Sequence, residues 1–213
     1  MTGYFADVAT LARKDLLLEL RSRDTVPAMV LFVVASLVVL HFALPTDASA
    51  RASDGLLWIG IVFTALLGLT RAFVAEREGN VMDGLVMAAY DRSAIWLGKT
   101  LSVLAFLGLA EVVALPAYSL FFRPVGWELV VAVVLADIGI AVVGTLLSAM
   151  AVASRARELL LPLLFLPLGI PVIVGGVGAT VADEPGRYLA FLALYDLVFA
   201  ILSWASFEYV VAE

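Results

Sequence analysis

Six apolar segments, each about 20 residues long or longer, occupy most of this 213-residue chain. A helix rises 1.5 Å per residue, so a segment of that length crosses the hydrocarbon core of a bilayer. These segments cover residues 26–44, 56–75, 94–122, 128–153, 159–181 and 188–210. They predict a membrane protein with six transmembrane helices.

The composition and the residue pattern together predict an all-α fold. The chain is 63% hydrophobic and 15% charged, whereas soluble domains carry roughly 25% charged residues. No segment alternates as a barrel strand does, and an open sheet cannot span lipid. We expect residues 1–213 to form a single transmembrane domain. Because the chain has no cysteine, disulfides and thiolate metal sites are excluded.

The basic residues predict the orientation of this six-span arrangement. Ten of them fall on the side of the termini and three on the other side, namely Arg51, Arg123 and Arg187. By the positive-inside rule, both termini lie in the cytoplasm of a bacterial inner membrane. Four acidic residues are expected on the outer side of the membrane: Asp47, Asp54, Asp183 and Glu184.

Residues 3–23 precede the first span and form an amphipathic pattern. The apolar residues that recur at helical spacing are Phe5, Val8, Ala9, Ala12, Leu16 and Leu20. A basic amphipathic helix ahead of a span typically lies in the plane of the lipid headgroups. We therefore predict an interfacial helix; the alternative is a solvated segment that only sets the topology.

The tripeptide Gly98-Lys99-Thr100 looks like the end of a phosphate-binding loop, but the rest of that motif is missing. Ser93 replaces its first glycine, and the residues between are bulky and apolar. We expect Lys99 to extend to the headgroups and to bind no nucleotide. A second glycine-rich stretch, residues 175–180, lacks a lysine and predicts close packing between helices.

The longest polar interruption, residues 76–92, lies on the predicted cytoplasmic side. Its apolar residues fall on one face of a short helix: Met82, Leu85, Val86 and Ala89. Its exposed charges include Glu76, Glu78 and Asp83. A short helix of this kind suits docking into a groove on a partner protein; the alternative is an interfacial turn.

Three acidic residues, Glu111, Asp137 and Asp196, lie inside three different predicted spans at similar depth. Carboxylates inside a membrane are costly and usually face a bundle interior or a watery cavity. They form either a polar layer that faces a substrate or partner, or hydrogen bonds between helices, with Tyr118, Ser102 or Thr145 as partners.

No catalytic or metal site is predicted from the remaining residues. His41 is the single histidine, near the end of the first span, and no second histidine is available to help it hold haem. We expect it to be an interfacial residue.

Three long stretches of the chain carry a family resemblance. They are LARKDLLLELRSRDTVPAMVLFVVASLVVLHFAL, WIGIVFTALLGLTRAFVAEREGNVMDGLVMAAYDRSAIWLGKTLSV and LLLPLLFLPLGIPVIVGGVGA. The chain resembles the cytochrome c maturation protein B family, the permease subunits of an ABC transporter traditionally called the haem exporter. The most specific features are the basic segment 13–23, the acidic segment 76–83 and the prolines Pro162, Pro167 and Pro171.

This resemblance implies that ATP is hydrolysed by a separate ATPase subunit. It assigns coupling to that subunit to residues of the segment 76–92, namely Glu76, Glu78, Gly79, Asp83 and Leu85. A proline common in the family after these residues is absent, since Ala88-Ala89-Tyr90-Asp91 stands there, so the resemblance does not fix the shape of the turn into the third span.

The resemblance also implies a homodimer, a haem-handling membrane protein and a small single-span subunit as partners. Haem is then the transported or handled species rather than a bound cofactor, and no nucleic-acid partner is expected. Two other functions stay open: a permease for a lipid, drug or polysaccharide, and a non-transporting membrane anchor of a redox enzyme.

Overall fold

The computed structural model describes residues 3–45, 50–71, 91–153 and 157–210, and these residues form helices joined by short connections. The helices are α1 (Tyr4–Ser22), α2 (Thr25–Ala43), α3 (Ala50–Arg71), α6 (Arg92–Phe121), α7 (Trp127–Ala153), α8 (Arg157–Val181) and α9 (Pro185–Val210). The prediction of an all-α fold is confirmed.

Six of these helices, α2 to α9, are long and apolar enough to cross a membrane, as predicted. Their described ends lie within three residues of the predicted ends in every helix except α3. Helix α3 begins at Ala50, six residues before the predicted start, and its described part ends at Arg71, four residues before the predicted end.

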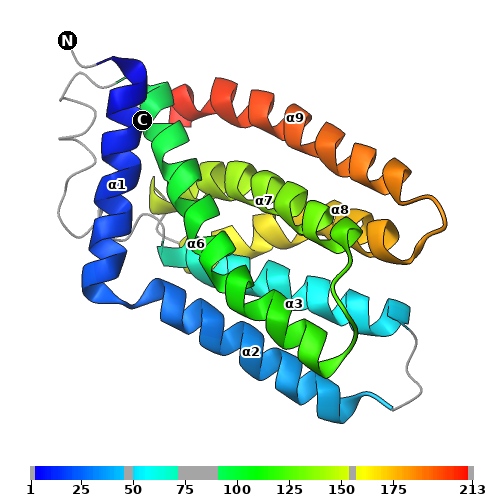
Figure 1. Cartoon of the computed structure of the whole chain (residues 1–213). Helices are drawn as coiled ribbons and strands as arrows, with labels where there is room; N and C mark the ends of the chain where they lie inside the picture. Colours follow the sequence, from blue (N-terminus) through cyan, green and yellow to red (C-terminus); the bar gives the residue numbers. More distant parts are fainter. Residues whose placement is uncertain (1–2, 46–49, 72–90, 154–156, 211–213) are drawn as a thin grey trace.

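Helix α7 lies at the centre of the bundle. In its most apolar stretch 67% of the residues are buried, against 17% in α2 and in α9. It packs most extensively on α8 and α9 and also contacts α6, while α2 packs on α3 and α6 (Figure 1). Helices α2 and α9 therefore lie at the periphery.

Helix α1 lies across one end of the bundle, where it packs on α6 (Figure 1). The C-terminal ends of α2, α6 and α8 lie at the other end, which we call the distal end. A tight corner joins α1 to α2: Arg23 adopts a left-handed conformation (φ 55°), and a Glu19 carboxylate oxygen accepts hydrogen bonds from the backbone N–H groups of Thr25 (2.8 Å) and Val26 (2.7 Å). Glu19 thus caps α2 and holds the corner.

Glycines allow α8 to approach its neighbours closely, which confirms the packing predicted for residues 175–180. A Cβ atom at Gly176 would overlap the Trp58 ring of α3, and one at Gly178 would overlap the Tyr188 ring of α9. Both rings occupy the space that a side chain would fill.

Candidate functional site

Helix α1 docks on the first half of α6 through Gly98. A Cβ atom there would lie 2.8 Å from Leu11 Cβ and 3.3 Å from the Val8 carbonyl oxygen, so only glycine permits this approach. Nearer the start of α6, the Ser93 hydroxyl donates a hydrogen bond to the Tyr4 hydroxyl (3.2 Å). The glycine that looked like part of a phosphate loop therefore serves helix packing.

Lys99 is buried, and its predicted extension to the headgroups is wrong. Its Nζ atom lies 2.9 Å from Asp15 Oδ2 on α1, and both residues are less than one-tenth exposed. The carboxylate, which sits on the face of α1 that contacts α6, offers a nearer partner than the headgroups.

The apolar residues of α1 divide between two faces. Val8 and Leu11 are buried against the bundle, whereas Phe5 and Leu20 are 79% and 69% exposed. The predicted single apolar face is thus only partly correct, because Leu11 and Asp15 also belong to the buried side. The exposed apolar side chains are those available to lipid.

Within the bundle, Glu111 of α6 and Asp137 of α7 lie next to each other, within reach of a hydrogen bond between their side chains. Both are buried, and one oxygen of each lacks a hydrogen-bond partner. The structure therefore brings together two of the three predicted acidic residues.

Asp196 of α9 does not join this pair. It packs against Gly139 of α7, where an added Cβ would lie 2.6 Å from its Oδ1 atom. Residues two apart on a helix point about 200° away from each other, so Gly139 and Asp137 face nearly opposite sides of α7. The three acids therefore do not form one contiguous surface.

The hydrogen-bond partners considered for these acids lie elsewhere. The Ser102 hydroxyl donates to the Gly98 carbonyl (2.9 Å), and the Tyr118 hydroxyl donates to Asp54. The Thr145 hydroxyl is buried without a partner. None of these three side chains hydrogen-bonds Glu111, Asp137 or Asp196, so the partners considered for the alternative of hydrogen bonds between helices are wrong.

A polar network joins three helices at the distal end. It consists of Asp54 in the second turn of α3, Tyr118 near the end of α6, Arg123 just after α6, and the carbonyl of Thr180 in α8, and we call it the distal network. Asp54 has no exposed surface, and its oxygens accept hydrogen bonds from Tyr118 and from two nitrogens of the Arg123 guanidinium, one of them, Nε, at 3.0 Å.

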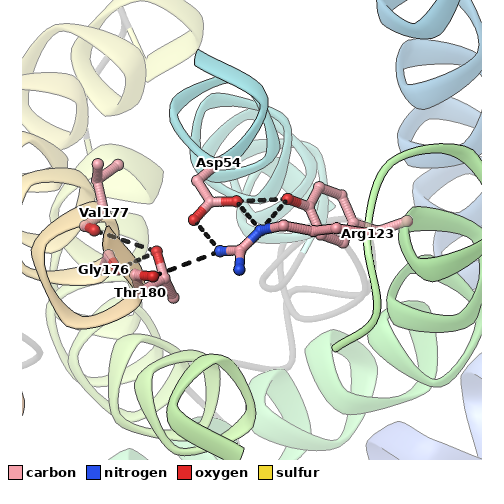
Figure 2. Close-up of polar contacts among 6 residues, drawn as sticks. Asp54, Arg123, Gly176, Val177 and Thr180 are labelled. Atoms are coloured by element: carbon pink, nitrogen blue, oxygen red, sulfur yellow. Dashed lines mark hydrogen bonds and ion pairs between the residues drawn. The ribbon is translucent and has the colours of Figure 1, made fainter. Parts of the chain in front are cut away.

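Arg123 extends this network to α8, as Figure 2 shows. Its Nη2 atom donates to the Thr180 carbonyl (3.5 Å), while the Thr180 hydroxyl donates to carbonyls one turn earlier in α8. The hydrogen bond to Asp54 raises the pKa of Arg123, so its charge persists. Asp54 lies inside α3, ahead of the predicted span, and these partners accommodate its carboxylate there.

The predicted coupling residues lie outside the described part of the chain: Glu76, Glu78, Gly79, Asp83 and Leu85. The structure does describe the start of the helix that follows them. The Asp91 carboxylate caps α6 by accepting from the Ser93 N–H (2.9 Å), and the Arg92 side chain donates to the Glu208 carbonyl of α9 (3.3 Å).

His41 lies at the distal end of α2 among aromatic rings. Its ring centroid is 5.3 Å from that of Phe121 and 5.8 Å from that of Phe122. No group of three metal-ligating side chains occurs among the described residues.

Comparison with known proteins identifies the family. The family described as "CcmB protein" matches residues 6–208, from the first turn of α1 to the last turn of α9. The chain belongs to the CcmB protein family.

Several curated relatives are named "Heme exporter protein B". The one from Bradyrhizobium diazoefficiens is 30% identical, over 91% of this chain and 89% of its own length. The one from Pseudomonas aeruginosa is 30% identical, over 83% and 81%. The one from Rhodobacter capsulatus is 31% identical, over 68% and 67%.

The sequence did not predict two ion pairs of this CcmB-family chain, Asp15–Lys99 and Asp54–Arg123. For each pair, the spacing of the acidic residue from buried apolar residues is a local signal. Asp15 lies at helical spacing from the buried Val8 and Leu11, which indicates a charge on the packed face. Asp54 precedes the buried Trp58 by one turn in the same way. Neither spacing identifies Lys99 or Arg123 as the partner.

Proposed function

We propose that this chain is the membrane-spanning permease subunit of an ABC transporter complex required for c-type cytochrome biogenesis. The observation that carries the proposal is the family match over residues 6–208, which includes nearly all of the six spans. The relatives' printed name supports haem as the species involved, either as the exported molecule or as the load of a chaperone that the complex releases.

In this proposal a separate ATPase subunit hydrolyses ATP and contacts the connection 76–92. One observation supports this arrangement: the sequence around Gly98 and Lys99 packs and pairs with α1, so it serves the fold. A second is that α3 ends and α6 begins at the end of the bundle where α1 lies (Figure 1). A connection placed there has both of its anchors beside α1.

We assign that end of the bundle to the cytoplasm of a bacterial inner membrane, with both termini on that side. The assignment rests on the ten-to-three asymmetry of basic residues. The distal network then lies near the opposite membrane surface.

The complex is proposed to contain two copies of this chain, a haem-handling membrane protein and a small single-span subunit. The peripheral position of α2 and α9 supports such assembly, because the side chains of both helices are largely exposed and available to lipid or to other membrane helices. The two other functions considered, a permease for a different cargo and an anchor of a redox enzyme, are not favoured by the family membership.

We also propose that the intramembrane acids Glu111, Asp137 and Asp196 are needed for activity rather than for insertion. Three buried carboxyl groups with oxygens that lack hydrogen-bond partners are costly to retain. Amide variants of the three should insert normally, and at least one, with Glu111 the first choice, should mature less c-type cytochrome at equal expression.

Co-purification tests the assignment of the ATPase contact. The chain carries an affinity tag in its native host, and the variant replaces Glu76, Glu78 and Asp83 with their amides or alanine. We expect the ABC ATPase to co-purify with the wild type and its recovery to fall at least several-fold in the variant. The matched control replaces Asp183 and Glu184, two exposed acids at the distal end, and should retain the ATPase. Equal recovery in all three samples would contradict the assignment.

A further inference from the structure

The carboxyl groups of Glu111 and Asp137 form a close pair in the interior of the bundle. They come from α6 and α7 and lie within reach of a side-chain hydrogen bond. The two residues are 8% and 5% exposed. Glu111 Oε1 and Asp137 Oδ1 have no hydrogen-bond partner, so the pair is only partly satisfied.

No basic side chain neutralises this pair in the described part of the chain. The buried ion pairs lie elsewhere, where Lys99 binds Asp15 and Arg123 binds Asp54. Helices α2 and α3 present only Val33, Ile61 and Thr64 to the space around Glu111.

The titratable groups that α9 brings to α7, Tyr195 and Asp196, contact Gly139 and lie away from this pair. Asp196 packs against Gly139, on the side of α7 away from Asp137. The Tyr195 hydroxyl donates to the Leu168 carbonyl of α8 (2.8 Å). The charge state of the pair is therefore set by its own two carboxyl groups.

We propose that Glu111 and Asp137 together form a proton-binding site in the membrane interior, in which one proton is held between the two carboxyl groups. Two adjacent carboxylates in a medium of low dielectric constant repel each other strongly. A single shared proton removes one charge and provides the donor for the hydrogen bond between them. Such a proton belongs to the pair rather than to either residue.

A small apolar cavity adjoins Glu111. The cavity lies between α2, α3 and α6, and its wall includes Glu111, Thr64 and Val33. The Thr64 hydroxyl donates to the Gly60 carbonyl (2.7 Å), which leaves its oxygen free to accept. Glu111 is therefore the member of the pair that borders this cavity.

The ligand is a proton rather than a metal ion because oxygen ligands are few. Hard cations take about six or more oxygens, whereas the described walls of this site supply the two carboxyl groups and one hydroxyl. A shared proton needs two oxygens only. The site is independent of which molecule the complex handles.

Infrared spectroscopy of the full chain in lipid vesicles at pH 7 tests the proposal, because a protonated carboxyl and a carboxylate absorb in separate regions. The spectrum of the double variant Glu111→Gln/Asp137→Asn is subtracted from that of the wild type. We expect the difference to contain one protonated carboxyl and one carboxylate per chain. The control variant Asp54→Asn should remove a carboxylate alone, since Asp54 is equally buried but paired with Arg123. A difference of two carboxylates, or of two protonated carboxyls, would overturn the proposal.

A second measurement needs no variant and covers the case in which the double variant does not fold. An apolar carbodiimide reacts with protonated carboxyl groups, and peptide mass spectrometry locates the product. We expect modification of Glu111, the member of the pair that lines the cavity, with Asp54 unmodified. Modification of Asp54 in preference to both Glu111 and Asp137 would contradict the proposed proton site.

Discussion

Asp15 and Lys99 form a buried ion pair that joins α1 to α6. The Lys99 Nζ atom lies 2.9 Å from Asp15 Oδ2, and Lys14, the neighbour of Asp15 along α1, lies 3.2 Å from the other carboxylate oxygen. The pair sits where α1 crosses the bundle, so it determines how firmly α1 is held against the first half of α6.

Loss of one member of this pair should be strongly destabilising. In Lys99→Met the Asp15 carboxylate stays buried without its closer partner, which costs about 3–5 kcal/mol for a buried pair. The double variant Asp15→Leu/Lys99→Met should recover most of that loss. Thermal unfolding in detergent measures both, with Lys14→Met as control, because Lys14 contacts the same carboxylate from a more exposed position. An equal loss of thermal stability in Lys14→Met and Lys99→Met would show that Lys99 is not the main partner of Asp15.

Gly98 should tolerate no side chain. In Gly98→Ala the new Cβ meets Leu11 and the Val8 carbonyl, so α1 must move away, at a cost of about 1–3 kcal/mol. Limited trypsin digestion at Arg13 and Lys14 should become faster as α1 loosens.

The matched control for this variant is Gly108→Ala, on the same helix. No atom lies within 4 Å of a Cβ at Gly108, and alanine favours a helix by about 1 kcal/mol over glycine. That variant should be neutral or stabilising. Similar digestion rates for both variants would show that α1 does not depend on the close approach at Gly98.

Replacing Arg123 should destabilise the protein much more than replacing Arg187. Arg123→Gln leaves Asp54, which has no exposed surface, without a cation, and should lower the free energy of unfolding by roughly 3 kcal/mol. Arg187 forms an exposed pair with Glu184 (3.5 Å), so Arg187→Gln should cost about 1 kcal/mol or less. Chemical denaturation compares the two, and equal losses would count against the network.

Hydropathy predicts the transmembrane helices well because the lipid requires each of them to be apolar along its length. A helix that crosses the hydrocarbon core needs an unbroken apolar run, and the predicted segment 128–153 matches α7 closely for that reason. The start of α3 could not be predicted in this way. Asp54 is a charged residue just before the apolar segment, so the sequence alone predicts that it lies outside the helix. In the structure it lies in α3 and binds Arg123, which is 69 positions away in the sequence.

The sequence also predicts the candidate site only in part. The sequence predicts that Glu111, Asp137 and Asp196 lie at similar depth, since depth follows from counting residues along a helix. It does not predict which helices are neighbours. The adjacency of Glu111 and Asp137 and the separate position of Asp196 follow from the packing of α7 between α6 and α9.

The proposed orientation predicts that both termini are cytoplasmic. A reporter that is active only in the cytoplasm, fused after Glu213, should be active, and a periplasmic reporter at the same site should be silent. The ten-to-three distribution of basic residues is the physical reason. The reverse pattern of reporter activity would place the connection 76–92 on the wrong side for a cytoplasmic ATPase.

The amount of haem-stained c-type cytochrome in cells that lack this gene tests the proposed function most directly. We predict that c-type cytochromes are lost while cytochromes with non-covalently bound haem remain, and that a plasmid copy of the wild-type chain restores them. Normal haem-stained c-type cytochrome in the deletion strain would contradict the proposal that this permease serves c-type cytochrome biogenesis.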